Sequence, residues 1–231
     1  MPLRALSLDL DDTLWPVWPA IHRAEAQLHR WLQRSAPATA AAHDLAAMRA
    51  LRAAVAIERP DWVHDLSAMR RESIRRALLA AGDDPALAEP AFEVFFDARQ
   101  QVELFDDVLP ALARLAARFP LVALSNGNAD VQRIPGLGRH FQAALSAREL
   151  GVGKPAAAAF LAACARAGCA PHELLHIGDD AALDVDGALQ AGLQAAWVRR
   201  PSLAAAGDAA PAGRPQHRVA DLLELADRLG C

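Results

Sequence analysis

The sequence predicts an α/β fold in which helices cover both faces of a parallel sheet and a helical domain is inserted after the first strand. Two changes in the spacing of apolar residues support this prediction. A short buried strand pattern at residues 6–10 is followed by helical patterns alone over residues 16–105. From residue 106 onward strand and helix patterns alternate, which is typical of a parallel sheet with helical crossovers. We therefore expect a core domain of residues 1–15 and 106–231, and an inserted helical domain of residues 16–105.

The opening strand is predicted from Leu6, Leu8 and Leu10, with Ala5 and Ser7 between them. Such a short, nearly continuous apolar run is typical of a strand buried in a parallel sheet. In parallel sheets the residues that bind ligands follow the carboxyl ends of the strands. The residues after this strand are therefore candidates for a functional site.

The inserted domain is expected to consist of helices. The tryptophans and prolines of residues 15–19 first predict a stiff loop, because proline fixes its own φ angle. Four amphipathic helical patterns follow, starting near Ile21, Leu45, Leu66 and Phe92. Gly82 is expected to end the third helix. The side chains of Phe92, Phe95 and Phe96 are expected to pack in the core of this domain.

The second half of the sequence supplies the remaining strands of the sheet. We expect strands at residues 121–126, 143–146, 174–180 and 194–200, and helices at residues 108–119, 155–168 and 183–192. Pro155 suits the first turn of its helix. Residues 201–217 are rich in Pro, Ala and Gly and predict a loop, after which a helix over residues 219–229 closes the chain.

Composition and charge exclude several classes of function. Of 231 residues, 53% are hydrophobic and 23% charged, as in globular proteins. The formal net charge of −4 offers no general attraction for nucleic acid or an anionic membrane. We expect neither a signal peptide nor a membrane span, and the cysteines lack metal-ligand spacing. These features predict a cytoplasmic protein, and we expect a monomer or homodimer that acts on a small molecule.

Each of the first four predicted strands is followed by polar residues. They are Asp9 and Asp11, then Ser125 and Asn126, then Lys154, and finally Asp179, Asp180 and Asp184. In an open parallel sheet these strand ends share one crevice. Asp9 and Asp11 are two residues apart, so a regular strand would point both to the same side. Their mutual repulsion there indicates a site for a divalent cation.

This set of side chains suits phosphoryl transfer. Carboxylates hold a hard cation that bridges to phosphate oxygens, and lysine supplies a point charge for the phosphate. A carboxylate can also attack phosphorus to give an aspartyl-phosphate, which divides one displacement into two steps. His176 lies inside an apolar strand, and we interpret it as a hydrogen-bonded core residue rather than a catalyst.

Four short motifs, DLDDT, LSN, Lys-Pro before a helix, and GDDAALD, run in this order from Asp9 to Asp184. Together they resemble the four motifs of the haloacid dehalogenase superfamily of phosphohydrolases. The fold of that family is a doubly wound parallel sheet with a cap domain, and the helical insertion is similar to its helical cap. The resemblance covers essentially the whole chain and implies a Mg²⁺-dependent phosphatase.

The resemblance implies a role for each residue at the first two strand ends. Asp9 would be the nucleophile and a metal ligand. Asp11 would be the general acid and base, and its backbone carbonyl would bind the metal. Thr13 would steady their loop. Ser125 would bind the phosphate through its hydroxyl, with help from backbone amides near Asn126.

The other strand ends are assigned in the same way. By resemblance, Lys154 would hold the nucleophile and the phosphoryl group together. Asp179 would be a direct Mg²⁺ ligand, and Asp184 would support the metal. Asp180 and Leu183 differ from the residues common in the family at these positions, which leaves the surroundings of the metal open.

Within the family, Asp11 favours hydrolysis of a phosphate ester over cleavage of a carbon–halogen bond. An alkoxide leaving group needs a proton, whereas a halide does not. A sugar phosphomutase or a haloacid dehalogenase of the same fold remains an alternative. A catalytically idle relative that binds a partner through its cap is a further one.

The sequences ALSNGNAD, GLGRHF and HIGDDAALDVDGALQAGLQAAWVR carry a narrower resemblance. They are similar to bacterial phosphatases that act on flavin mononucleotide and on 5-amino-6-(5-phospho-D-ribitylamino)uracil, a riboflavin precursor. The expected substrate is thus a small phosphate ester. Candidates for substrate contacts in the cap or at its entrance are Trp15, Trp18, His22, Trp62, His64 and Arg70.

Overall fold

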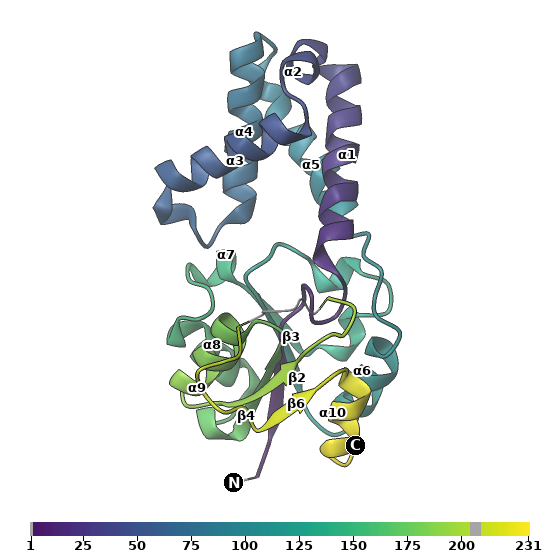
Figure 1. Ribbon diagram of the computed structural model, residues 1–231, viewed down its shortest axis with the longest axis vertical. Helices are drawn as coiled ribbons and strands as arrows, with labels where there is room; N and C mark the ends of the chain where they lie inside the picture. Colours follow the sequence, from purple (N-terminus) through teal and green to yellow (C-terminus); the bar gives the residue numbers. More distant parts are fainter. Residues whose placement is uncertain (1, 204–208) are drawn as a thin grey trace. The chain divides into compact units, whose positions relative to one another are not determined.

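The computed structural model describes residues 2–203 and 209–231. The chain divides into two compact units, which Figure 1 colours by sequence. The core unit comprises Met1–Pro16 and Glu103–Cys231, and the helical unit comprises Val17–Val102. The helical unit is thus one continuous stretch, whereas the core unit is assembled from two stretches that lie far apart in the sequence.

A parallel sheet forms the centre of the core unit. In spatial order its strands are β3 (Ala143–Ser146), β2 (Leu121–Ser125), β1 (Ala5–Leu8), β4 (Leu174–Gly178), β5 (Gln194–Val198) and β6 (His217–Val219). All neighbouring strands pair in parallel, and Leu6 of β1 lies between Leu121 and Leu175. The predicted α/β fold is therefore confirmed. The strand order switches direction beside β1, and open parallel sheets bind ligands at such a switch point.

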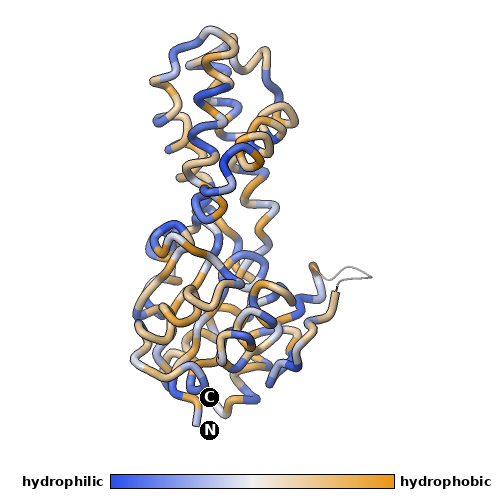
Figure 2. The backbone as a smooth tube through the Cα atoms, turned by 90° about the vertical axis from the view of Figure 1, so that its left-hand side faces the viewer, coloured by the Kyte–Doolittle hydropathy of each residue, from blue (hydrophilic) through white to orange (hydrophobic). Residues whose placement is uncertain are grey.

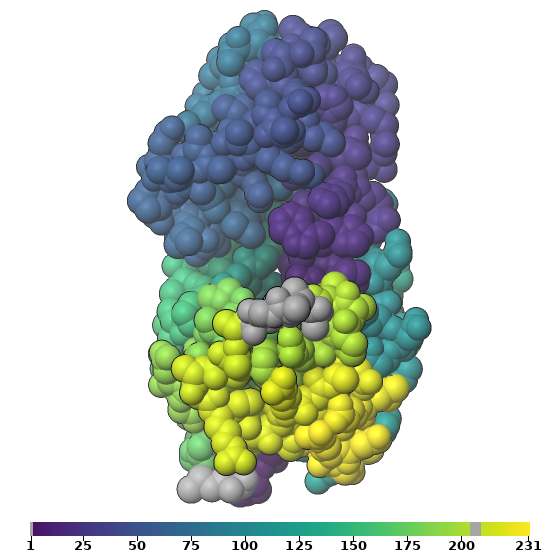
Figure 3. Space-filling view, viewed as in Figure 1, coloured from purple at the N-terminus to yellow at the C-terminus, as the bar shows by residue number. Residues whose placement is uncertain are grey.

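Helices cover both faces of this sheet (Figure 1). One face carries α8 (Ala157–Ala167) and α9 (Gly187–Gln190), and the other carries α6 (Val108–Ala116) and α10 (Leu222–Arg228). Every residue of β1, β2 and β4 is buried, as expected for strands covered on both sides. In Figure 3 the C-terminal segment, coloured yellow, forms much of the visible face of the core unit.

The starts of three helices in the core unit differ from the prediction. The helix expected from Pro155 begins at Ala157, because Pro155 and Ala156 belong to the preceding turn, in which Ala156 N donates to Gly153 O at 3.0 Å. The helix expected from residue 183 begins as a π-helical turn at Ala181–Asp186, which the Asp180 side chain caps. The closing helix begins at Leu222, and the residues before it form the edge strand β6. Within the predicted loop of residues 201–217, residues 204–208 lie outside the described residues.

The helical unit contains the expected helices and one short addition. They are α1 (Val17–Ser35), α2 (Pro37–Ala42), α3 (Leu45–Glu58), α4 (Leu66–Ala81) and α5 (Ala88–Arg99), of which α2 is the addition. Hydrophilic and hydrophobic positions alternate along these helices (Figure 2). Their apolar faces enclose a core in which Phe92 and Phe95 are buried and Phe96 packs against them, as predicted. Gly82 ends α4 in the left-handed conformation at φ 82°.

The prediction of a loop at residues 15–19 is wrong for residues 17–19. Helix α1 begins at Val17, so Trp18 and Pro19 lie in its first turn. Proline is tolerated there because the first N–H groups of a helix have no acceptor within the helix. Across residues 2–203 and 209–231, no helix combines the length and the apolar character that crossing a bilayer requires.

Candidate active site

Asp9 follows β1 directly and lies at the switch point of the sheet. Its backbone N–H donates to the Ile177 carbonyl of β4 at 2.9 Å, which extends the pairing of the two strands by one residue. The Asp9 side chain is buried. A carboxylate in such a position is costly unless it is paired, so the groups around Asp9 determine what the site can do.

Lys154 is the buried cation of the site. Its ammonium group donates to Asp9 Oδ1, and to Asp184 Oδ1 at 2.6 Å. The Asn126 side chain fixes the backbone of Lys154, since Asn126 Oδ1 accepts from Lys154 N and Asn126 Nδ2 donates to Lys154 O, both at 2.8 Å. A side chain at Gly153 would lie only 2.5 Å from Asn126 Oδ1, so glycine is required beside this pair. The Asn126 side chain thus positions Lys154. The expected contact between phosphate and the backbone amides near Asn126 stays a prediction.

The end of β4 contributes the remaining carboxylates. Asp179 Oδ1 accepts from the Thr13 hydroxyl at 2.8 Å, which joins the loop after β1 to the loop after β4. Asp184 turns back over Gly178, where a Cβ atom would lie 2.2 Å from Asp184 Cγ. The Asp180 carboxylate accepts from Ala182 N and Leu183 N at 2.8 Å, so it caps the following turn.

His176 has hydrogen-bond partners at both ring nitrogens, as expected of a core histidine. Nε2 lies 3.1 Å from Asp184 Oδ1, and Nδ1 lies 2.8 Å from the Ser7 hydroxyl. Because a carboxylate only accepts, Nε2 carries the proton and the Ser7 hydroxyl donates to Nδ1. Burial lowers the pKa of His176, against the opposing effect of Asp184. A neutral imidazole therefore donates a hydrogen bond to the Asp184 carboxylate.

The site has two buried carboxylates, Asp9 and Asp184, a half-buried one, Asp179, and one lysine. Burial raises the pKa of Asp9 well above its usual range; Lys154 lowers it, and Asp184 and Asp179 raise it further. Burial and the Asp184 charge raise the pKa of Asp179 to about 7, while the Thr13 hydrogen bond opposes them. Burial also raises the pKa of Asp184, but Lys154 and His176 outweigh it and lower that pKa overall. The charge of Lys154 thus compensates the charge of one carboxylate. The charges of the other two carboxylates need a further cation.

These residues fit a divalent metal ion. Asp9, Asp179 and Asp184 each offer an oxygen, and the three oxygens lie within 4.8 Å of one another. Carboxylate oxygens are ligands that Mg²⁺ takes in proteins, so these three side chains would hold such an ion. The group does not include the Asp11 side chain. Asp11 was predicted to bind the metal through its backbone carbonyl, and this contact stays a prediction.

Asp11 and Ser125 meet around Gly127. Asp11 Oδ1 accepts from the indole Nε1 of Trp15 at 2.8 Å. The Ser125 hydroxyl accepts from Gly127 N at 2.9 Å. A Cβ atom at Gly127 would lie 2.5 Å from Asp11 Oδ2 and 3.2 Å from Ser125 Oγ. Glycine therefore permits the close approach of the loops after β1 and β2.

Two residues of the site were missed or misplaced by the sequence reasoning. Trp15 was predicted at the entrance or in the cap, but it is fully buried in the core unit beside Asp11. Arg200 follows β5 and is buried; Nε and Nη2 donate to the Thr13 carbonyl at 3.0 and 2.7 Å, and Nη1 donates to Asp107 at 2.7 Å. The position of Arg200 at the end of an apolar strand pattern was the sequence feature that could have indicated its place in the site.

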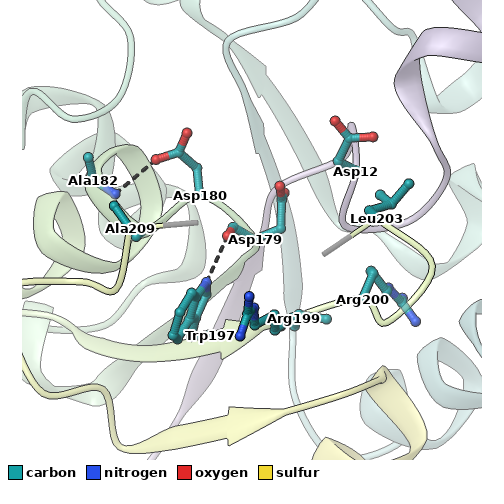
Figure 4. Close-up of a pocket in the computed structure, with 11 residues that line it drawn as sticks. Asp12, Asp179, Asp180, Ala182, Trp197, Arg199, Arg200, Leu203 and Ala209 are labelled. Atoms are coloured by element: carbon teal, nitrogen blue, oxygen red, sulfur yellow. Dashed lines mark hydrogen bonds between the residues drawn. The ribbon is translucent and has the colours of Figure 1, made fainter. Parts of the chain in front are cut away.

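A pocket of about 360 Å³ opens beside Asp179 in the core unit (Figure 4). Asp12 and Asp180 border it at the loops after β1 and β4, and Trp197 of β5 and Arg199, directly after β5, border it as well. The Trp197 indole N–H donates to the Asp179 carbonyl at 2.8 Å, as Figure 4 shows. A volume of this size is within the range of pockets that bind small molecules.

Comparison with known proteins gives three kinds of similarity. A model of the haloacid dehalogenase-like hydrolase family matches residues 3–192. The chain is 35% identical over 201 residues to the 5-amino-6-(5-phospho-D-ribitylamino)uracil phosphatase YigB of Escherichia coli (strain K12), covering 85% of this chain and 84% of that protein. It is 36% identical over 161 residues to the phosphoserine phosphatase of Thermus thermophilus, covering 68% and 63%. The crystal structure of a 2-haloacid dehalogenase from Pseudomonas syringae pv. Tomato DC3000 matches with a TM-score of 0.89 at 38% identity, covering 99% of this chain and 98% of that chain.

Proposed function

The chain belongs to the haloacid dehalogenase-like hydrolase family, and we propose that it is a Mg²⁺-dependent phosphatase of a small phosphorylated metabolite. The observation that carries this proposal is the contact of Lys154 with both Asp9 and Asp184 beside Asp179. It combines a buried nucleophile, a phosphate-binding cation and an excess of carboxylates. Phosphoryl transfer through an aspartyl-phosphate intermediate uses all three.

The reaction proceeds in two displacements at phosphorus. Asp9 attacks the phosphorus atom, the ester P–O bond breaks, and Asp11 gives a proton to the leaving oxygen. Water then attacks the aspartyl-phosphate and loses a proton to Asp11, so that inorganic phosphate leaves and Asp9 is regenerated. Lys154 and the Ser125 hydroxyl hold the phosphoryl oxygens in both steps. Mg²⁺, held by Asp9, Asp179 and Asp184, would neutralise charge on those oxygens.

Asp11 is the reason to prefer phosphatase over dehalogenase chemistry. Displacement of halide needs no proton, so a dehalogenase gains nothing from an acid at this position. The named dehalogenase with a closely matching fold makes the distinction worth testing directly. The two named phosphatases among the relatives support the phosphate ester.

The substrate we propose is flavin mononucleotide or the phosphorylated riboflavin precursor. Identity of 35% to the phosphatase YigB over 85% of this chain supports the precursor. The pocket of about 360 Å³ beside Asp179 offers room for part of such a molecule, with Trp197 and Arg199 in its wall. Within this proposal, the helical unit acts as the cap of the active site.

The test is a hydrolysis screen with the purified protein over flavin mononucleotide, the riboflavin precursor, sugar phosphates, phosphoserine, an aryl phosphate and 2-haloacids. We expect release of phosphate with Mg²⁺, none with chelator, and no release of halide. Asp9→Asn should lose at least about 10³-fold in kcat/KM with its thermal unfolding retained, because the attacking oxygen is gone. An unstable aspartyl-phosphate should be detectable by mass spectrometry in the wild-type protein alone.

The outcomes separate the alternatives. Halide release without phosphate release would make the protein a dehalogenase. Turnover by Asp9→Asn near the wild-type level would remove Asp9 as the nucleophile. Hydrolysis of sugar phosphates alone, with no activity on the two flavin-related compounds, would retain the phosphatase and discard the proposed substrate.

A further inference from the structure

We propose that Trp15 is a positioning residue for Asp11: its indole N–H holds Asp11 Oδ1, so that Oδ2 faces the loop after β2. This inference rests on the proposed function, in which Asp11 is the general acid. The observation is the bond from Trp15 Nε1 to Asp11 Oδ1 at 2.8 Å, made by a tryptophan that is fully buried.

The turn that carries both residues is closed by backbone hydrogen bonds. Asp12 N donates to Trp15 O at 2.8 Å, and Leu14 N donates to Leu10 O at 2.8 Å. Phe105 N donates to Leu14 O at 3.0 Å, which ties the turn to the segment where the chain re-enters the core unit. The indole ring therefore has a fixed direction relative to the Asp11 carboxyl group.

The backbone of the same turn is conformationally costly. Asp12 has a φ of 58°, and it is alone among the described non-glycine residues in having a positive φ. Aspartate tolerates this region better than most residues, but the conformation still costs about 1 kcal/mol or more. Such a turn persists where the surrounding structure requires it, and here it brings the Trp15 indole back onto Asp11.

The geometry gives the two oxygens of Asp11 different surroundings. An indole N–H only donates, so Asp11 Oδ1 is the oxygen that accepts from Trp15. Asp11 Oδ2 and the Ser125 hydroxyl, the predicted phosphate ligand, lie 2.5 and 3.2 Å from the point where a Gly127 Cβ would stand. Oδ2 is thus the oxygen that faces the loop after β2, and in the proposed reaction it exchanges the proton.

This arrangement serves both displacements. In the first, the O–H bond at Oδ2 breaks as the leaving oxygen takes the proton, and the new carboxylate keeps the indole hydrogen bond at Oδ1. In the second, attacking water gives its proton back to Oδ2. In both steps the indole hydrogen bond keeps Oδ2 in the same direction.

The test compares leaving groups in wild type and Trp15→Phe. Phenylalanine fills most of the same apolar space and lacks the N–H. We expect kcat/KM for alkyl phosphates, which leave as poor alkoxides, to fall about tenfold to hundredfold. For nitrophenyl phosphate, whose leaving group needs little protonation, we expect a change within about threefold. kcat/KM is the proper parameter because it excludes the later hydrolysis of the aspartyl-phosphate.

Two variants frame this comparison. Asp11→Asn should show the same dependence on the leaving group with a larger loss. Trp31→Phe, a matched change at a tryptophan that packs against the core of the helical unit, should lower all substrates equally or not at all. An equal loss for alkyl and aryl phosphates in Trp15→Phe would overturn the inference, yet leave the phosphatase intact. A wild-type protein that hydrolyses neither would instead defeat the proposed function.

A measurement on the folded protein covers the case in which Trp15→Phe does not fold. The chain has five tryptophans, so ¹⁵N labelling gives five indole N–H signals. Asp11→Ala removes the acceptor at 2.8 Å and should move one of these signals strongly upfield. An Asp11→Ala protein that leaves all five signals in place would contradict the bond on which the inference stands.

Discussion

The core unit and the helical unit each bury a cluster of charges, and the two clusters have opposite surpluses. In the core unit the Lys154 ammonium group contacts Asp9 and Asp184, and the Asp179 carboxylate lies beside theirs. In the helical unit the single carboxylate of Glu25 accepts from Arg49 at 2.8 Å and pairs with Arg70 at 3.5 Å. The cluster of the core unit has more carboxylates than cations, and the cluster of the helical unit has more cations than carboxylates.

The shifted pKa values follow these surpluses. In the core unit burial and neighbouring carboxylates raise the pKa of Asp179 to about 7. In the helical unit burial and the charge of Arg52 lower the pKa of Arg70 to about 9, although Glu25 opposes them. Arg70 also has its guanidinium carbon 3.7 Å from the centre of the Phe95 ring, which stabilises it without a counter-charge.

The difference separates a site from a structural cluster. The surplus arginine charge of the helical unit has an aromatic face to pack on, and Arg49 reaches solvent with 44% of its side chain exposed. In the core unit, Asp9 and Asp184 are buried and Asp179 is half-buried beside the pocket, and each of the three carboxylates offers an oxygen within 4.8 Å of the other two. A surplus of negative charge that a proton or a metal ion can neutralise is what a metal-assisted reaction requires.

The choice of cation also differs. Lys154 is the only lysine in the sequence, and all the other permanently charged cations are arginines. Lysine is a compact point charge, whereas the planar guanidinium is larger and binds in a fixed fork. A point charge fits between Asp9 Oδ1 and Asp184 Oδ1 in a way that arginine does not. This argument gives the first and largest of the following predictions.

Replacement of Lys154 should be the most damaging single change, whichever residue is introduced. Lys154→Met should lower kcat/KM at least about 10³-fold, because the phosphoryl group loses its cation. It should also lower the free energy of unfolding at pH 8 without Mg²⁺ by about 3 to 5 kcal/mol, since buried carboxylates lose their partner. Lys154→Arg keeps the charge and should lose nearly as much activity. Steady-state kinetics and urea unfolding provide the two measurements.

Addition of Mg²⁺ serves as the control for Lys154→Met. Because Mg²⁺ neutralises the same carboxylates, it should restore part of the stability and little of the activity. A Lys154→Met protein as stable as wild type in chelator at pH 8 would mean that the three carboxylates are not a strained surplus.

Removing the carboxylate from the cluster of the helical unit should lower the free energy of unfolding and leave the catalytic reaction unaffected. Glu25→Gln leaves the Arg70 guanidinium, whose side chain is 8% exposed, without a counter-charge. We expect a loss of about 3 kcal/mol in the free energy of unfolding, measured by urea titration at pH 7. Glu58→Gln is the matched control, because Glu58 is 54% exposed in its pair with Arg76 and should change stability by less than about 1 kcal/mol. Equal effects of the two variants would mean that burial does not distinguish them.

Much of this arrangement followed from the sequence, for a physical reason. Asp9, Lys154, Asp179 and Asp184 were expected to share one crevice because the carboxyl ends of parallel strands meet at one edge. The structure brings these four together. The strands themselves were recognisable because burial on both faces leaves a nearly continuous apolar run.

Other features depend on contacts that no local pattern records. Strand β6, with the sequence His-Arg-Val, has no apolar run and exists because it pairs with β5 at the edge of the sheet. Only the backbone near Asn126 was given a role, in phosphate binding, and the hydrogen bonds from its side chain to the backbone of Lys154, 28 residues away, were not foreseen. Trp15 was expected in the cap or at its entrance as a substrate contact, and only the folded turn directs its indole onto Asp11.

The smallest expected effect concerns the pH dependence of Mg²⁺ binding. The pKa of Asp179 is raised to about 7 by burial and by Asp184, whereas an unfolded aspartate titrates near 4. Between about pH 4 and pH 7 the folded protein therefore binds more protons than the unfolded chain. The stability that Asp179 contributes is present below about pH 4 and is lost as pH rises through about 7. The metal-free protein should accordingly unfold more easily at pH 8 than at pH 5.5.

Mg²⁺ should reverse this loss, because it takes the place of the proton. A concentration of one hundred times the dissociation constant at pH 8 stabilises by about 2.7 kcal/mol. Affinity should fall roughly tenfold for each pH unit below 7, so the same concentration should give less than about 1 kcal/mol at pH 5.5. Thermal unfolding in matched ionic strength, with NaCl in place of MgCl₂ as the control, measures the difference. Asp179→Asn, which cannot titrate, should flatten it, and an equal Mg²⁺ effect at both pH values in wild type would contradict the raised pKa as its cause.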